Sequence, residues 1–139
     1  MRILAVDYGH KRIGLAVSDE SATLARPLLV LKHVSRVVDA AQVAEMAATH
    51  AAGQIVVGVS YDEDGALNTA GHSAARFAEA LRQQTTLPVR LWDETLTTLD
   101  ARATRLSMGV GRKKRSGHLD DVAAALLLQN YLDQQESRT

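Results

Sequence analysis

Residues 55–59 are four β-branched side chains and one glycine, and this run constrains the fold more than any other segment. A strand that covers only one face of a sheet alternates apolar and polar residues. An uninterrupted apolar run is instead typical of a strand that is buried on both faces. Such a strand needs other elements packed above and below it. We therefore expect a sheet with helices on both sides.

Three further apolar runs predict strands at the start of the chain. They lie at residues 2–7, 12–18 and 27–31, and a tight turn at Gly9 follows the first. Pro27 suits the start of the third strand, because proline cannot donate the N–H that an internal position of a sheet requires. The short connections between these runs predict an antiparallel meander.

Helical spacing follows the third strand. Ser35 is expected to cap a helix that extends to about residue 51 and is ended by Gly53. Further helices are expected at residues 69–84, 97–108 and 119–133, and a further strand at 88–92. A meander followed by alternating helices and strands predicts an α/β fold, with a mixed sheet in a single domain over residues 1–139.

The 139 residues include no cysteine, which excludes a disulfide framework, a cysteine-based zinc site and a thiol nucleophile. This absence fits a reducing compartment such as the cytoplasm. The chain starts with a predicted strand that has one arginine and no long apolar segment, so we expect no signal peptide. No apolar stretch approaches the roughly 18 residues that a membrane span needs. We expect a cytoplasmic protein that does not contact membranes.

Positive charge is concentrated in one segment, although the formal net charge of the chain is zero. Residues 101–119 contain no acid. Their basic side chains are Arg102, Arg105, Arg112, Lys113, Lys114 and Arg115. Such a block favours phosphate binding, and Lys113, Lys114 and Arg115 would grip a nucleic-acid backbone with little sequence preference. The alternative is a solvated loop that keeps the protein soluble.

Carboxylates stand at the ends of predicted elements. Asp7 ends the first strand, and Asp93 with Glu94 ends the strand before the basic segment. Ligands of α/β sheets gather beyond the carboxyl ends of parallel strands, so these acids could lie side by side. Asp120 and Asp121 open the last helix and could supply a third acid, although one acid there is also favoured by the helix dipole.

Three converging carboxylates would repel one another unless a divalent cation held them. Their hard oxygen atoms suit Mg²⁺ or Mn²⁺, which retain open positions for water and phosphate oxygens. Two such ions about 4 Å apart would clamp a phosphodiester and activate water, so no serine, cysteine or histidine nucleophile is needed.

Four segments resemble the motifs of one known family. Residues 7–19 (DYGHKRIGLAVSD) are similar to the opening motif of the YqgF/RuvX family, which is described as Holliday junction resolvases. Residues 57–65, 93–98 and 120–132 resemble its later motifs, in the same order. The resemblance implies an RNase H-like fold and a metal-dependent nuclease. Family members are also linked to maturation of the 5′ end of 16S ribosomal RNA.

The same resemblance implies roles for individual residues. Asp7 matches the first acid of the family and Asp120, rather than Asp121, matches the last. The middle acid would be Glu94 or Asp93, and we favour Glu94 because its side chain reaches further from the strand end. Lys11 and Arg12 would bind a phosphate that flanks the scissile one, with Arg112 as a further contact.

Position 95 departs from the family, which usually has arginine after the Asp-Glu pair where this chain has Thr95. The resemblance favours a nuclease that acts on branched DNA or precursor ribosomal RNA. Because of Thr95, the alternative is a factor that binds nucleic acid in ribosomal RNA processing and cleaves it weakly or not at all. Symmetric cutting of a junction is simplest for a two-fold dimer, so we also expect a homodimer.

Overall fold

A computed structural model describes residues 1–94 and 119–137. Five strands form one mixed sheet in the order β3-β2-β1-β4-β5. The strands are β1 Arg2–Tyr8, β2 Arg12–Ser18, β3 Ala25–Lys32, β4 Ala52–Val59 and β5 Val89–Asp93. The helices of the described ranges are α1 Arg36–Thr49, α2 Thr69–Arg82 and α5 Leu119–Ser137.

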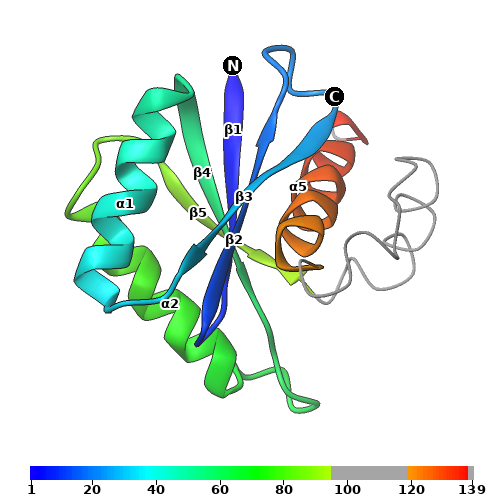
Figure 1. The fold of residues 1–139 in the computed structure, drawn as a ribbon. Coiled ribbons are helices and arrows are strands. Elements are labelled where there is room, and N and C mark those ends of the chain that lie inside the picture. Colours follow the sequence, from blue (N-terminus) through cyan, green and yellow to red (C-terminus); the bar gives the residue numbers. More distant parts are fainter. Residues whose placement is uncertain (95–118, 138–139) are drawn as a thin grey trace.

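The strand directions follow the predicted meander. β1 pairs antiparallel with β2, and β2 pairs antiparallel with β3. The crossover through α1 makes β4 parallel to β1, and the crossover through α2 makes β5 parallel to β4. The carboxyl ends of β1, β4 and β5 therefore meet at one edge of the sheet, where Figure 1 shows the end of β5 beside the start of α5.

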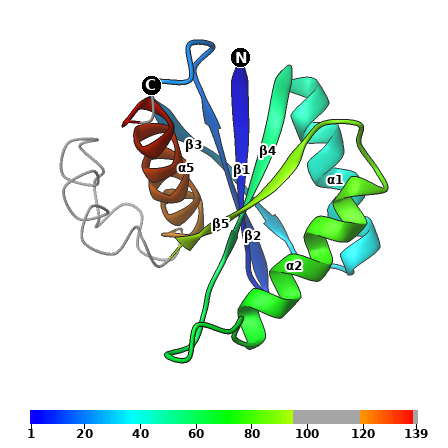
Figure 2. The ribbon, with the colours of Figure 1, turned by 180° about the vertical axis from the view of Figure 1, so that it is seen from behind.

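Helices cover both faces of the sheet, as the apolar run in β4 predicted. Figure 1 and, from behind, Figure 2 show α1 and α2 on one face and α5 on the other. In β4, Ile55 and Val57 pack in the core under α1 and α2, whereas Val56 packs in the core under α5. Each face of this strand thus contributes to a separate apolar cluster, which explains why the run has no polar positions.

The end of α1 differs from the expectation. Ser35 caps the helix as predicted, and its hydroxyl accepts a hydrogen bond of 3.2 Å from the N–H of Val38. The helix ends at Thr49, and Ala51 takes the left-handed conformation at φ 54°. Gly53 lies inside β4, where a Cβ atom would collide with the side chain of Met1. Gly53 is therefore a residue of the strand and does not end the helix.

The expected helix at residues 97–108 lies outside the described residues. None of the helices within the described ranges has the length and hydropathy needed to cross a bilayer.

Candidate active site

Asp7 lies near the carboxyl end of β1, on the face of the sheet that α5 covers. Side chains alternate along this strand. Ile3 and Ala5 belong to the core under α5, and Leu4 belongs to the opposite core. The same alternation turns the half-buried Asp7 toward α5. Its strand partner on β2 is Gly14, which has no side chain to crowd the carboxylate.

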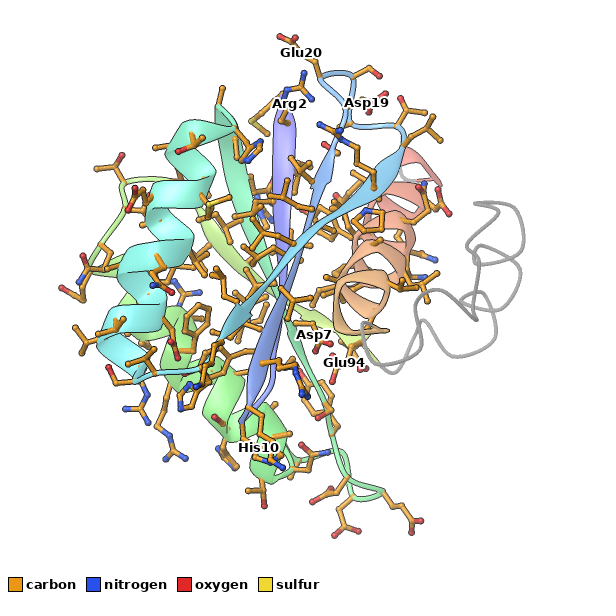
Figure 3. The ribbon with its side chains drawn as sticks, viewed as in Figure 1. Arg2, Asp7, His10, Asp19, Glu20 and Glu94 are labelled. Atoms are coloured by element: carbon orange, nitrogen blue, oxygen red, sulfur yellow. The ribbon has the colours of Figure 1, made fainter. Side chains whose placement is uncertain are left out.

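Glu94 follows the last residue of β5 and meets Asp7 at the same edge of the sheet. Trp92, two residues earlier, packs against the core under α5, so alternation carries Glu94 to that face as well. A side-chain hydrogen bond joins the carboxyl groups of Asp7 and Glu94. Figure 3 shows the two side chains together beside the start of α5. We call Asp7 and Glu94 the acid pair.

The surroundings of Glu94 disfavour its charged form. Burial raises the pKa of this carboxyl, the hydrogen bond with Asp7 acts in the opposite direction, and the charge of Asp93 raises the pKa further. A carboxylate that loses hydration and faces like charges is stabilised by a cation. The oxygen donors of the acid pair are those that Mg²⁺ and Mn²⁺ prefer, so these residues fit such an ion.

Asp93 belongs to the other side of the sheet. Its strand partner is Val59, which packs in the core under α1 and α2. Asp93 instead lines an open pocket of about 560 Å³ with Tyr61, Asp62, Glu63 and Gly65. Of the two acids between which the sequence left a choice, Glu94 is therefore the one that contacts Asp7.

Gly58 provides the space in which Glu94 lies. A Cβ atom at this position would be 3.0 Å from Oε2 of Glu94 and 2.9 Å from Cδ2 of Leu127 on α5. The carboxylate of Glu94 thus lies against the backbone of β4, next to α5. We assigned no role to Gly58 from the sequence, although its interruption of the β-branched run was a usable signal.

Asp120 and Asp121 lie in the first turn of α5. Position 120 is seven residues, or about two helical turns, before Leu127, so it falls on the stripe of the helix that passes Gly58. The side chains of both aspartates are outside the described part of the structure. Within that part, no three Asp, Glu, His or Cys side chains form a group that could hold a metal ion.

Comparison with known families gives a match over residues 1–134 to the family described as "RuvX: Holliday junction resolvase". The chain belongs to the RuvX family. The match includes the acid pair, Gly58 and most of α5, and it confirms the resemblance that the four sequence motifs suggested.

Curated RuvX relatives cover nearly the whole chain. A protein of Thermoanaerobacter pseudethanolicus named "Putative pre-16S rRNA nuclease" is 37% identical over 139 residues, which are 99% of this chain and 100% of the relative. A protein of Syntrophus aciditrophicus with the same name is 40% identical over 133 residues, which are 96% of this chain and 89% of the relative.

Solved structures share the RuvX fold at lower identity. The RuvC of T. thermophilus in complex with a Holliday junction substrate superposes with a TM-score of 0.66 at 18% identity, covering 99% of this chain and 97% of that one. The fowlpox virus resolvase bound to Holliday junction DNA gives a TM-score of 0.60 at 15% identity, covering 97% and 99%. These similarities and the sheet order confirm the predicted RNase H-like fold with a mixed five-stranded sheet.

The basic residues predicted for this RuvX chain divide into two groups. Lys11 lies in the turn between β1 and β2, and Arg12 is the first residue of β2. The turn is tight because the N–H of Gly9 donates a hydrogen bond of 3.0 Å to the carbonyl of Arg12. A Cβ atom on Gly9 would lie 2.6 Å from that oxygen, so only glycine fits. The second group, Arg112, Lys113, Lys114 and Arg115, lies outside the described residues.

Proposed function

We propose that this RuvX chain is a divalent-metal-dependent nuclease that hydrolyses phosphodiester bonds in structured nucleic acid. The single observation that carries the proposal is the acid pair. Two carboxyl groups, 87 positions apart in the sequence, share a hydrogen bond at one edge of the sheet, and burial raises the pKa of Glu94. A bound cation would stabilise this arrangement, and carboxylate-bound cations are common at phosphoryl-transfer sites.

Asp7, Glu94 and Asp120 would hold Mg²⁺ or Mn²⁺, with two ions as the expected number. When bound, these ions supply charge stabilisation at the phosphate oxygens and activation of water. The contribution of the protein is to fix the carboxylates. Asp7 and Glu94 are attached to the ends of strands in one packed sheet, which holds them more precisely than a loop could. Lys11 and Arg12 would orient the strand through a neighbouring phosphate.

The names of the relatives favour precursor 16S ribosomal RNA as the substrate, and the family description favours four-way DNA junctions. A direct test is to incubate the purified protein with end-labelled junction, duplex, single strand and precursor RNA, each with Mg²⁺, Mn²⁺ or chelator. Cleavage of at least one substrate that depends on metal supports the proposal. Tight binding without cleavage in every arm would support the alternative of a non-catalytic RNA-processing factor. The reason for considering this alternative is Thr95, which stands where the family usually has arginine.

Asp7→Asn keeps the size of the side chain and removes its charge. We expect this variant to lose Mn²⁺-dependent cleavage while nucleic-acid binding remains. Asp133 is an exposed carboxylate near the opposite end of α5. Asp133→Asn is therefore the control and should cleave as the parent does. Full activity of Asp7→Asn would remove Asp7 from the site.

We also propose that the protein acts on junctions as a homodimer. A four-way junction offers two equivalent strands, and a two-fold dimer presents two equivalent sites to them. Light scattering at micromolar concentration, with and without a junction, tests this point. A monomer under both conditions would count against paired cutting of junctions without affecting the proposed chemistry of a single site.

A further inference from the structure

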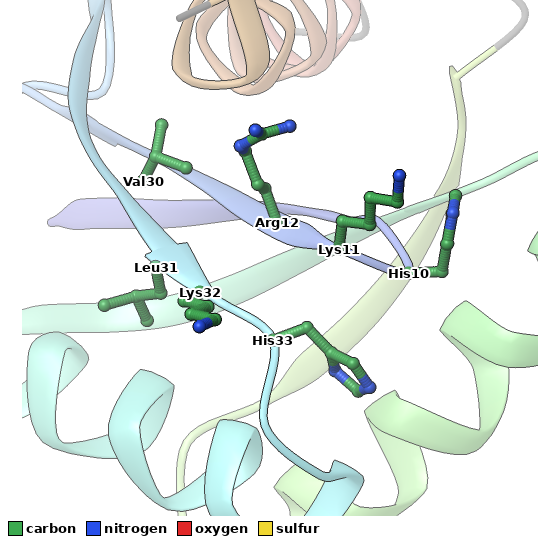
Figure 4. A pocket seen from close by; sticks show the side chains of 7 residues that line it. All are labelled: His10, Lys11, Arg12, Val30, Leu31, Lys32 and His33. Atoms are coloured by element: carbon green, nitrogen blue, oxygen red, sulfur yellow. The ribbon is translucent and has the colours of Figure 1, made fainter.

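The ends of β2 and β3 enclose a pocket of about 590 Å³, a volume typical of small-ligand sites. We call it the β2–β3 pocket, and Figure 4 shows it from close by. Its lining residues are His10, Lys11, Arg12, Val30, Leu31, Lys32 and His33. Only the pair Lys11 and Arg12 was assigned a binding role from the sequence.

Three cations line the β2–β3 pocket, and the strand register pairs two of them. Arg12 pairs directly with Lys32 across the two strands, and the N–H of His33 donates a hydrogen bond of 3.0 Å to the carbonyl of Lys11. Like charges at directly paired positions destabilise a sheet. Within the described residues, Lys11, Arg12 and Lys32 form no ion pair, and no carboxylate lines the pocket. An anion between these side chains would relieve the repulsion.

His33 is held in place by a buried carboxylate. Asp39, in the first turn of α1, is completely buried and lies 2.5 Å from Nδ1 of His33. Its other oxygen accepts a hydrogen bond of 2.9 Å from the N–H of Val34. In the described part of the chain, Nδ1 makes both side-chain hydrogen bonds of the imidazole, so Nε2 is left for a ligand in the pocket.

Tyr8 ties this network to β1, the strand that also carries Asp7. Its hydroxyl donates a hydrogen bond of 2.9 Å to Asp39, and its ring is stacked on Phe77 at a centroid distance of 4.1 Å. Burial, followed by the hydrogen bond with Asp39, raises the pKa of Tyr8, so the hydroxyl remains a donor. Tyr8 directly follows Asp7 in β1. The network around His33 and the acid pair are therefore attached to the same strand, on opposite faces of the sheet.

The β2–β3 pocket also lies close to the acid pair along the sheet. Asp7 pairs with Gly14 on β2, and Arg12 precedes Gly14 by two residues. Two residues of a strand span about 7 Å, a distance comparable to one or two steps between phosphates along a nucleic-acid strand. Arg12 and Gly14 share the same face of β2 because side chains alternate.

We propose that the β2–β3 pocket holds one nucleotide of the substrate strand, next to the scissile phosphate, with Lys32 and His33 as binding residues. Asp39 positions His33. Lys11 and Arg12, which extend toward the α5 side of the strands, would contact the phosphate on one side of this nucleotide, and Lys32 with the Nε2 atom of His33 would contact the phosphate on its other side (Figure 4). Val30 and Leu31 would provide an apolar wall for the sugar or base. This assignment rests on the proposed function, since it places the pocket on the strand that the acid pair would cut.

A purely structural role is the alternative for His33, because the contacts of Asp39 also fasten the start of α1 to β1 and β3. The variant His33→Asn separates the two roles. The asparagine Nδ2 takes the position of Nδ1 and still donates to Asp39, but the variant has no atom at the position of Nε2. A structural residue would tolerate this change, whereas a binding residue would not.

The test measures binding of a fluorescent single-stranded oligonucleotide, as RNA and as DNA, by anisotropy in the presence of chelator at several salt concentrations. We expect Lys32→Ala to weaken binding about tenfold and to flatten the slope of log K against log salt by about 0.7, the value for one lost phosphate contact. His33→Asn should weaken binding about threefold with an unchanged melting temperature. Arg26→Ala removes a cation about 20 Å away on β3 and should leave the slope unchanged.

The inference would be overturned if Lys32→Ala and His33→Asn both left the oligonucleotide affinity and the salt slope unchanged. It would also be overturned if Arg26→Ala reduced the affinity as much as Lys32→Ala does. Competition with inorganic phosphate and with AMP distinguishes a strand from a free nucleotide. If AMP bound saturably and Lys32→Ala weakened AMP binding but not oligonucleotide binding, the inference would also be overturned. Because the chelator prevents cleavage, these outcomes are separate from the metal-dependent cleavage assay, and either result can fail alone.

Discussion

The carboxylate of Glu94 lies so close to Gly58 that a single Cβ atom on the glycine would come within 3.0 Å of Oε2. The two residues stand at neighbouring parallel strands, and Leu127 of α5 closes the space from above at 2.9 Å from the same position. A glycine within a strand costs stability, so its presence near the end of β4 is explained by the close approach of the acid and the helix.

Gly58→Ala should therefore impair cleavage more than folding. Both neighbours are ends of side chains rather than backbone, so small shifts admit the methyl group, but Glu94 must then shift relative to Asp7. A displacement of about 1 Å at a reacting centre can reduce the rate about 100-fold. We expect a loss of kcat between about 10- and 100-fold with a shift of only a few degrees in melting temperature. Gly53→Ala, at the other end of β4, has the exposed side chain of Met1 as its nearest neighbour and serves as the matched control.

Glu94→Gln and Asp93→Asn form a second matched pair, because adjacent carboxylates point to opposite faces of the sheet. The Glu94→Gln substitution keeps the length of the side chain but removes the charge that binds a cation. We expect a loss of cleavage of about 100-fold or more, measured as kcat at saturating Mn²⁺. Asp93→Asn should change kcat by less than about threefold. The reverse order of effects would show that the middle acid had been assigned to the wrong residue.

The sequence predicted the fold well because the fold is encoded in local patterns. The unbroken run at residues 55–59 required cover on both faces, and Ser35 identified the start of α1. The end of α1 was predicted less well. A left-handed residue after a helix is usually glycine, but here Ala51 takes that conformation, and the contact of Met1 with Gly53 joins residues that are far apart in the sequence.

The candidate site was predictable only in part. A strand end rich in acids marks where chemistry can occur, but the choice between Asp93 and Glu94 depends on the pleat of β5 against β4. The β2–β3 pocket was harder to anticipate. Its positioning residue, Asp39, sits in the first turn of a helix, where an acid is ordinarily explained by the helix dipole. Only the folded chain brings His33 and Tyr8 to it.

Stability of the metal-free protein should depend on pH through Glu94. Burial raises the pKa of this carboxyl in the folded state, so the folded protein retains a proton that the unfolded chain has already released. Between the ordinary and the raised pKa, the free energy of unfolding therefore falls as pH increases, and the full penalty is present above the raised value. Glu94→Gln cannot ionise and should melt at a higher temperature than the parent at neutral pH.

The measurement is thermal unfolding in chelator from about pH 4 to about pH 8. The difference in melting temperature between Glu94→Gln and the parent should be small at the acidic end and should grow with pH. Glu45→Gln, at an exposed position of α1, should follow the parent across the whole range. A difference for Glu94→Gln that does not vary with pH would indicate an effect of packing rather than of ionisation.

Asp39→Ala should destabilise the fold strongly. The substitution removes three hydrogen-bond contacts, with the hydroxyl of Tyr8, Nδ1 of His33 and the N–H of Val34, and it leaves the partly buried hydroxyl of Tyr8 without its acceptor. Loss of a buried acceptor of this kind costs about 3 kcal/mol, measured as the free energy of unfolding in urea. Ser35→Ala, which removes only the cap of the same helix, should cost about 1 kcal/mol. Equal effects of the two substitutions on the free energy of unfolding would mean that the buried network stabilises the fold no more than an ordinary helix cap does. Contacts other than those with Asp39 would then have to hold His33 in the pocket.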